Sequence, residues 1–554
     1  MKKYLLLASV VLTWISCKKG GDDGPVNPQP SNFSVSTITV DQVLAGAVIY
    51  NVNFTPAIKF IFPTKINGTT VTPALSFKNS SGADIPFSSS LQNGDSSVLV
   101  TPAAPLTDIS KYSVSLAGGT LKSQAGGSLS VAAAISFVTK IDSTDKFPLI
   151  SDNALLDLVQ QQTFKYFWDF GHPTSGLARE RNTSGDICTS GGSGFGVMAI
   201  IAAVNRGFIT RAQALARLQT MVGFLKNTAQ TFHGAYPHWL NGNSGVVVPF
   251  STNDNGADLV ETSYLIQGLL CARQYFNDAG AAETNLRTDI NFICNRVEWD
   301  WFRQGTQNVL YWHWSPSVGW AMNMKIEGWN ECLITYVLAA SSTTHAIPAI
   351  VYTNGYARNG GIRNNNVYYN FTLPLGTAYG GPLFFSHYSF LGINPNGLTD
   401  QYANYLTQVV NHSKINYAYC VNNPQGNYGY SNLCWGLTAS DIKNGYTASS
   451  PTNDVGVIAP TAALSSFAYT PTESMQALKF FYYKMGNRLW KEYGFVDAFS
   501  LKDQWFANSF LAIDQAPIIV MIENYRSGLL WNLFTSCPEV KNGMRGLGFT
   551  APYL

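Results

Sequence analysis

The sequence has 554 residues, enough for two to four domains of ordinary size. Charged residues make up only 12% of it, and 35 lysines and arginines almost balance 33 acidic residues, for a net charge of +2. A nucleic-acid binder would need a basic stripe, so no nucleic-acid partner is expected. The 46% of hydrophobic residues can bury a large core, which excludes disorder for most of the chain. An integral membrane protein is also disfavoured, because no apolar run of about 18 residues follows the N-terminus.

Residues 1–17 resemble a bacterial lipoprotein signal peptide. Lys2 and Lys3 form a positive end, an apolar stretch follows, and a small serine precedes Cys17. We therefore expect a lipid anchor on Cys17, a solvated tether over 18–32, and an exported protein held at a membrane in the periplasm or at the cell surface. The alternative is a plain secreted protein without lipid.

The remaining cysteines and the histidines give no sign of a metal centre. Seven cysteines remain after Cys17, an odd and sparse number that does not form a disulfide framework. His233 and His238 are five residues apart with no glutamate between them, so the helical zinc-protease pattern is absent. We therefore expect buried free thiols and neither a metal ion nor a cofactor.

Residues 33–140 have the texture of a β-domain. Short runs of alternating polar and apolar residues are separated by turn-forming clusters, a pattern typical of a small β-sandwich. The pattern resembles the bacterial immunoglobulin-like modules that precede extracellular enzymes. The segment contains no tryptophan, so we expect a spacer. The four clearest strand candidates are 58–62, 97–101, 112–116 and 135–139.

The rest of the chain, 150–554, is predicted to be helical, which makes the protein mainly α. Apolar residues recur at helical spacing, and Thr210 is placed to cap one of the helices. Paired antiparallel helices in a closed ring would bring inner helices together at a central cleft, so we expect an (α/α)6 toroid. The predicted helices are 154–170, 194–205, 210–229, 257–277, 283–300, 329–340, 401–417, 472–486 and 516–525.

The helical segment also holds almost all the tryptophans. Twelve of the thirteen lie from Trp168 onward. Sugar rings stack their C–H faces on indole rings, so this enrichment favours a carbohydrate-binding cleft, although tryptophan also fills helical cores. We predict that Trp312, Trp314 and Trp329 bind substrate.

Three acidic residues lie close together at the start of one predicted helix. Asp254, Asp258 and Glu261 are spaced by four and three residues, which predicts one helical face for Asp258 and Glu261. Their like charges should raise at least one pKa. The alternative is that Asp254 caps the helix and the other two acids complement its dipole.

Glu331 is predicted to lie on an apolar helical face with Ile334 and Leu338. Desolvation there would raise the pKa of Glu331 and favour the protonated carboxyl that a general acid needs. A buried structural glutamate is the alternative.

Asp514 precedes Pro517, which marks the start of a helix. A helix N-terminus favours an ionised carboxylate, which suits a base that activates water, although simple capping would explain the same position. Asp441, in a loop-rich segment, is a further cleft candidate. We assign Asp441, Asp254 and Arg179 to substrate binding.

At these residues the chain resembles a known family. The segment 154–549 is similar to the glucoamylase-like domain of glycoside hydrolase family 144, the bacterial endo-β-1,2-glucanases. The resemblance implies an (α/α) toroid and hydrolysis of β-1,2-glucan with inversion, in a cleft whose acids match Asp254, Asp258, Glu261, Glu331 and Asp514. The stretches that carry it are 193–196, 206–210, 328–331, 381–384, 435–441, 458–463, 493–499, 513–517 and 521–528.

An inverting reaction requires an acid and a base about 6.5–9.5 Å apart, with water between the base and the anomeric carbon. We assign Glu331 as the acid and Asp514 as the base, with Asp258 and Glu261 as a rival acid site or as substrate-orienting groups. The expected partner is a glucan oligosaccharide or polysaccharide, bound by a monomer that touches the membrane only through Cys17. Open alternatives are a glycan-binding lipoprotein without catalysis, a toroid lyase or epimerase, and a hydrolase of glucans with another linkage.

Overall fold

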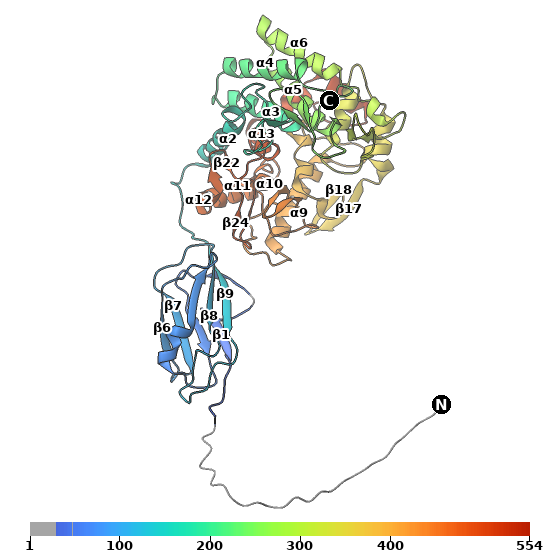
Figure 1. Cartoon of the computed structure of the whole chain (residues 1–554). Helices are drawn as coiled ribbons and strands as arrows, with labels where there is room; N and C mark the ends of the chain where they lie inside the picture. The colour runs from blue at the N-terminus through green and yellow to red at the C-terminus, as the bar shows by residue number, and fades with distance from the viewer. Residues whose placement is uncertain (1–28, 47) are drawn as a thin grey trace, which may run out of the picture. The chain divides into compact units, whose positions relative to one another are not determined.

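The computed structural model describes residues 29–46 and 48–554. The chain divides into two compact units, Met1–Lys140 and Ile141–Leu554. In its described part the first unit is built from strands and the second mainly from helices (Figure 1). Cys17 and the predicted signal peptide lie outside the described residues.

The N-terminal unit is a sandwich of two sheets. One sheet has the order β2-β1-β4-β7-β6, and the other has the order β3-β9-β8-β5 with β3 parallel to β9. In β4, β7 and β8 alternate residues are buried between the sheets, and Phe60, Phe77 and Phe137 are fully buried there. All four predicted strand runs are strands of this unit. The strands are β1 (Thr37–Val40), β2 (Val43–Leu44), β3 (Ile49–Val52), β4 (Ile58–Ile61), β5 (Leu75–Asn79), β6 (Phe87–Gln92), β7 (Ser97–Pro102), β8 (Lys111–Leu116) and β9 (Ala133–Thr139), with a short helix α1 (Val71–Ala74).

The second unit contains the longer helices and many short hairpin strands. Its helices are α2 (Asp152–Trp168), α3 (Ser190–Asn205), α4 (Arg211–Asn227), α5 (Leu259–Tyr275), α6 (Ala281–Asn295), α7 (Leu333–Ser341), α8 (Ala349–Val351), α9 (Tyr405–Asn422), α10 (Pro460–Leu464), α11 (Pro471–Lys479), α12 (Gly486–Leu489), α13 (Ala512–Ser527), α14 (Leu529–Thr535) and α15 (Pro538–Gly546). Its strands are β10 (Ile187–Thr189), β11 (Trp239–Asn241), β12 (Val247–Val248), β13 (Ala257–Asp258), β14 (Leu310–Tyr311), β15 (His313–Trp314), β16 (Lys325–Ile326), β17 (Arg363–Tyr368), β18 (Phe371–Leu375), β19 (Ala439–Ile442), β20 (Gly445–Ala448), β21 (Trp490–Lys491), β22 (Gly494–Phe495), β23 (Phe499–Ser500) and β24 (Trp505–Phe506).

The helices form an inner and an outer layer of a ring. In the inner layer α3 packs against α5 and α13, and α5 also packs against α7. Outer helices cover them, with α2 against α13 and α15 against α7, while α4 packs against α6 (Figure 1). Almost every residue of α3 and α5 is buried, as expected for helices surrounded on all sides.

Two glycines explain how closely α3 and α5 approach each other. A Cβ on Gly194 would collide with the backbone of Tyr264 and Leu265, and one on Gly268 would collide with the backbone of Gly194. The glycine-rich stretch before Gly194 is the first turn of α3, because α3 begins at Ser190. The small residues therefore serve helix packing.

Most predicted helices are present, but several boundaries differ. Helix α7 begins at Leu333, so Glu331 lies in the turn before it and not on a helical face. Helix α13 begins at Ala512, and Pro517 lies inside the helix. Helix α6 ends at Asn295. Thr210 caps α4 as predicted, accepting a hydrogen bond from the backbone N–H of Gln213 in a full capping box. Among the described residues, no helix is both long and apolar enough to cross a membrane.

Candidate active site

The N-terminal ends of the inner helices meet at one cavity of about 380 Å³. Thr189 precedes α3, Glu261 lies in the first turn of α5, and Glu331 precedes α7. Backbone N–H groups at helix N-termini favour negative charge, so this convergence suits a cavity lined by carboxyls. The lining residues are Glu180, Arg181, Thr189, His238, Trp239, Phe250, Glu261, Tyr264, Trp312, Glu331, Phe384, Tyr388, Ala439, Tyr446, Leu511 and Ile513.

Glu331 is a cavity carboxyl without a cation partner among the described residues. The neighbouring Asn330 accepts a hydrogen bond from Cys332 N at 3.0 Å, and the hydroxyl of Ser389 donates to the Glu331 carbonyl, so the turn before α7 is fixed. Burial raises the pKa of Glu331 to about 7, and the negative charge of Asp258 adds to the effect. The raised pKa expected from the sequence is therefore present, although the residue lies outside the helix.

Glu261 lies on the same cavity and is held by the start of α3. Its Oε2 accepts hydrogen bonds from Gly191 N at 2.7 Å and from the Thr189 hydroxyl at 3.1 Å. Burial raises the pKa of Glu261, and the negative charge of Asp258 acts in the same direction, while His238 opposes it. The two N-terminal helix ends thus fix the direction of this carboxyl.

Asp258 and Asp254 are placed differently from the prediction. Asp258 is the N-cap of α5, where its Oδ1 accepts hydrogen bonds from Val260 N at 3.0 Å and Glu261 N at 2.8 Å. Because a cap residue has an extended backbone, Asp258 and Glu261 do not share a helical face, and this prediction was wrong. Asp254 is also buried, and neither aspartate lines the cavity.

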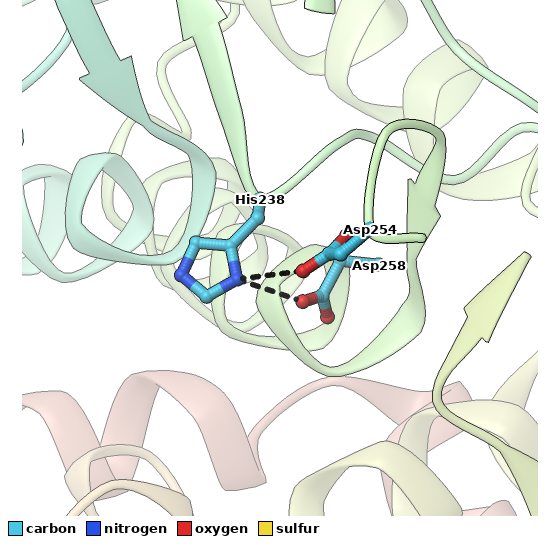
Figure 2. A group of neighbouring side chains, drawn as sticks. All are labelled: His238, Asp254 and Asp258. Atoms are coloured by element: carbon cyan, nitrogen blue, oxygen red, sulfur yellow. Dashed lines mark ion pairs between the residues drawn. The ribbon is translucent and has the colours of Figure 1, made fainter. Parts of the chain in front are cut away.

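Two histidines lie beside these aspartates. His238 Nδ1 is 3.1 Å from an oxygen of Asp258 and 3.6 Å from one of Asp254 (Figure 2). His313 Nε2 lies 3.6 and 3.5 Å from the same two oxygens. Burial alone would raise the pKa of Asp258, but the close contact with His238 and the charges of the two histidines hold that pKa below its usual value.

Asp514 lies in the first turn of α13 and is buried beside Asp497. Asp514 Oδ2 and Asp497 Oδ1 accept no hydrogen bond from any other group among the described residues, and the two carboxyls are hydrogen-bonded to each other. A shared proton satisfies both oxygens. Burial and the charge of Asp497 raise the pKa of Asp514 well above its usual value, so the expected effect of the helix dipole is outweighed.

Asp514 does not itself line the cavity, but Tyr388 connects it to the cavity. The hydroxyl of Tyr388 donates to Asp514 Oδ1 at 3.4 Å, and Tyr388 is one of the lining residues. Burial also raises the pKa of Asp497 to about 7. The Asp514–Asp497 pair therefore holds a proton close to neutral pH, and the Tyr388 hydroxyl connects this pair to the cavity.

Arg181 holds two further carboxylates at the cavity edge. Its Nε lies 3.0 and 3.1 Å from the Glu180 oxygens, and its Nη1 lies 3.2 Å from both oxygens of Asp441. Asp441 lines a second hollow of about 490 Å³, and Arg181 and Tyr446 line both hollows. Sequence reasoning missed Arg181 and Glu180, although three consecutive charged residues in a chain so poor in charge are a usable signal.

The predicted substrate-binding residues divide between the cavity and the packing. Trp312 lines the cavity. Trp314 packs on Trp301 with ring centroids 5.3 Å apart, and Trp329 is buried with its ring 6.0 Å from that of Phe390. These side chains fill aromatic clusters, since an indole packs as well in a core as on a sugar.

Arg179 lies with its guanidinium 4.5 Å from the ring centre of Phe170, and it is not among the lining residues. The cavity instead takes its aromatic wall from residues that the sequence did not single out. Phe250 stacks on His238 with ring centroids 4.2 Å apart, and Trp239 packs on Phe250 with ring centroids 4.8 Å apart. An aromatic wall beside carboxyls is suited to a neutral, hydroxyl-rich ligand.

A helical toroid with a carboxyl-lined, aromatic-walled cavity at its inner helix ends is typical of carbohydrate-active proteins. A family model described as "Putative glucoamylase" matches residues 323–538, and one described as "Bacterial Ig-like domain" matches 34–139. The expected fold class, an (α/α)6 toroid after an immunoglobulin-like sandwich, is confirmed.

Three relatives identify the family. The structure of an endo-β-1,2-glucanase from Chitinophaga pinensis is 51% identical, covering 73% of this chain and 100% of that one, with a TM-score of 0.72. A β-1,2-glucanase structure from Parabacteroides distasonis is 37% identical, covering 94% of this chain and 74% of that one, with a TM-score of 0.71. An exo β-1,2-glucooligosaccharide sophorohydrolase of P. distasonis is 46% identical over 426 residues, which is 73% of this chain but only 59% of that relative's length. The chain belongs to this glucoamylase-like family, glycoside hydrolase family 144.

Proposed function

We propose that this protein hydrolyses β-1,2-linked glucan, with inversion and by attack within the chain. The observation that carries the proposal is Glu331, a carboxyl that lines the cavity, has no cation partner among the described residues and has a pKa of about 7. Such a group holds a proton near neutral pH and can give it to a leaving oxygen. The relatives named for action on β-1,2-glucans support the choice of linkage.

In the proposed reaction Glu331 donates its proton to the glycosidic oxygen as the bond to the anomeric carbon breaks. A water molecule attacks that carbon from the opposite face, and its proton passes to the base, so the new hydroxyl has the opposite configuration. The aromatic wall formed by Trp312, Trp239 and Phe250 supports stacking of the neutral sugar rings.

For the base we propose Asp514, acting with Asp497. The pair shares one proton and keeps one negative charge, so it can accept the proton of the attacking water through the Tyr388 hydroxyl. Glu261 is the rival, because it lines the cavity directly. Substituting each by its amide separates them: a small anion such as azide should restore turnover in the variant that lacks the base, giving a glycosyl azide.

We also propose that the protein is exported and anchored by a lipid on Cys17, and that it acts as a monomer. The lysines, apolar stretch and cysteine of residues 1–17 support the anchor. Replacing Cys17 by alanine should move the protein from the membrane to the soluble fraction of its native host, and light scattering of the purified chain gives its mass.

The central test is to incubate the purified protein with linear β-1,2-, β-1,3- and β-1,4-glucans and to measure new reducing ends. Products from the β-1,2-glucan alone are expected. Binding without products would support a glycan-binding protein, products with a new double bond would support a lyase, and preference for another linkage would overturn the substrate assignment.

The Glu331→Gln variant tests the acid. Its activity should fall by about 10²–10⁴-fold on the glucan and recover on a sophoroside with an acidic aryl leaving group, which needs no protonation. The matched control is Glu327→Gln, four residues earlier and exposed, which should keep full activity. Near-normal glucan hydrolysis by Glu331→Gln would remove Glu331 from the acid role.

A further inference from the structure

Four side chains from separate segments converge beside the cavity. His238 precedes β11, Asp254 follows β12, Asp258 ends β13, and His313 begins β15. The Nδ1 atom of His238 and one carboxylate oxygen from each aspartate lie within 4.8 Å of one another (Figure 2). The cluster is invisible in the sequence because its members are up to 75 residues apart, so the expectation of no metal, drawn from spacing, did not address it.

Atoms at the centre of this cluster contact one another but make no well-aligned hydrogen bond among the described residues. Asp258 is fully buried; its Oδ1 caps α5, while its Oδ2 makes no hydrogen bond among the described residues. His238 Nδ1 is likewise buried without one. Figure 2 shows that Nδ1 faces the oxygens of both aspartates at once. An N–H bond directed at one acceptor fits this arrangement less well than a shared cation does.

The donor set matches a divalent transition metal. Imidazole nitrogens and carboxylate oxygens are ligands of Zn²⁺, whereas Ca²⁺ and Mg²⁺ prefer oxygen alone. Bonds of about 2.0–2.1 Å in a tetrahedron place neighbouring ligand atoms about 3.3 Å apart. The four nitrogen–oxygen separations here are 3.1, 3.5, 3.6 and 3.6 Å. Two carboxylates would also neutralise the charge of such an ion.

We propose that His238, Asp254 and Asp258 bind one divalent metal ion of the zinc type, with His313 beside the two aspartates. The ion holds one wall of the cavity in place. His238 lies on that wall and stacks on Phe250, and Trp312, the neighbour of His313, lies there too. Because none of the three ligands donates or accepts the proton of the proposed hydrolysis, the site is a positioning device and stands independently of the proposed function.

The test uses the full chain prepared without a polyhistidine tag. The protein is stripped with a chelator, dialysed, and titrated separately with Zn²⁺, Mn²⁺ and Ca²⁺, with bound metal measured by mass spectrometry of the elements and by calorimetry. We expect one Zn²⁺ per chain, bound more tightly than Mn²⁺ or Ca²⁺, and a rise in the thermal midpoint on loading. Absence of stoichiometric Zn²⁺ from the folded wild-type protein, or tighter binding of Ca²⁺, would overturn the proposal.

Variants locate the ion. Asp254→Asn and His238→Gln should each lower the Zn²⁺ affinity at least tenfold and remove the thermal shift. The matched control is His345→Gln, which breaks a partly exposed histidine–aspartate pair with Asp300 at 3.1 Å and should bind zinc like the wild type. Undiminished affinity in both ligand variants would place the ion elsewhere and refute the assignment. If a variant does not fold, the wild-type titration still decides.

Discussion

The two ends of helix α13 bury carboxyls in opposite ways. At its C-terminal end Glu523 is fully buried and meets Arg206, with Nε–Oε2 and Nη2–Oε1 distances of 2.6 and 2.9 Å. Burial alone would raise the pKa of Glu523, but the hydrogen bonds from Arg206 and Ser527 hold that pKa below its usual value. At the N-terminal end Asp514 has a second carboxyl for a neighbour, and its pKa is raised.

The helix therefore contains two kinds of buried acid: one stabilises the fold, and the other can be protonated near neutral pH. A carboxylate neutralised by arginine stays ionised and joins helices, whereas a carboxyl without a cation retains a proton near neutral pH. Glu331 and Asp514 belong to the second kind. The N-terminal sandwich differs from both ends of α13, because no acid is buried in its described part. Its buried polar residues there are Ser97, Ser123 and Thr139.

The largest expected effect is that of Asp514→Asn. The amide cannot accept the proton of the attacking water, so kcat should fall by about 10²–10⁴-fold. The fold should persist, because the amide retains the shape of the side chain and can donate to Asp497. Reducing-end assays and circular dichroism measure the two effects. Unchanged kcat in a folded variant would transfer the base role to Glu261.

Glu523→Gln should lower stability and leave activity nearly unchanged, which is the reverse of the effect expected for Asp514→Asn. Removing this charge leaves Arg206 without its counter-ion, and the free energy of unfolding should fall by about 3–5 kcal/mol. The value of kcat at low temperature should stay within about twofold, since the residue lies at the far end of the helix from the first-turn Asp514.

Chemical denaturation measures the loss of stability in Glu523→Gln. The control is Asp289→Asn, which removes a partly exposed pair with Lys226 at 2.6 Å and should cost less than about 1 kcal/mol. If the two variants lose equal stability, the buried pair does not have the structural role assigned to it.

The contrast between the two ends of α13 lies beyond what periodicity can predict. Helical spacing located most of the helices, and alternation located four strands of the sandwich, because both patterns report local burial. The pattern did not reveal that Asp497, in a short segment after β22, would reach Asp514. That contact depends on how distant segments of the ring close on each other.

The candidate site was predicted in part for a related reason. Glu331 and Glu261 stood out as acids among apolar residues, and both line the cavity. Trp314 and Trp329 carried the same sequence signal as Trp312, yet they pack in aromatic clusters, since indole burial looks alike in a core and in a cleft. Composition therefore indicated the ligand class better than it indicated the individual contacts.

Glu331 should make stability depend on pH. Its pKa is about 7 in the native state against an ordinary value of 4.5, so the native protein binds more protons than the unfolded chain between these values. Stability present at low pH is then lost as the pH rises through 7, by up to about 3 kcal/mol. Glu331→Gln lacks this loss, so its stability relative to wild type should increase from pH 5 to pH 8.

Thermal unfolding of both proteins across this range checks the result, and comparison with wild type cancels the titration of Asp497. The same pKa predicts that wild-type activity declines as the pH rises above about 7, because the general acid loses its proton. A difference in stability that does not change with pH would mean that Glu331 is ionised throughout.

The smallest effect expected is that of Tyr388→Phe, which acts on the cavity side of the Asp514 pair. The ring contacts with Phe195 and Phe384, at 5.3 and 5.1 Å, remain, so the fold should not change. The lost hydrogen bond to Asp514 is long, and its removal should cost about 1 kcal/mol, or about fivefold in kcat/KM. Because that bond lowers the pKa of Asp514, its loss should move the acidic limb of the pH profile to higher pH. A slower enzyme with an unmoved acidic limb would show that Tyr388 contacts substrate and does not connect the cavity to Asp514, and the base would then have to be sought among the carboxyls on the cavity wall itself.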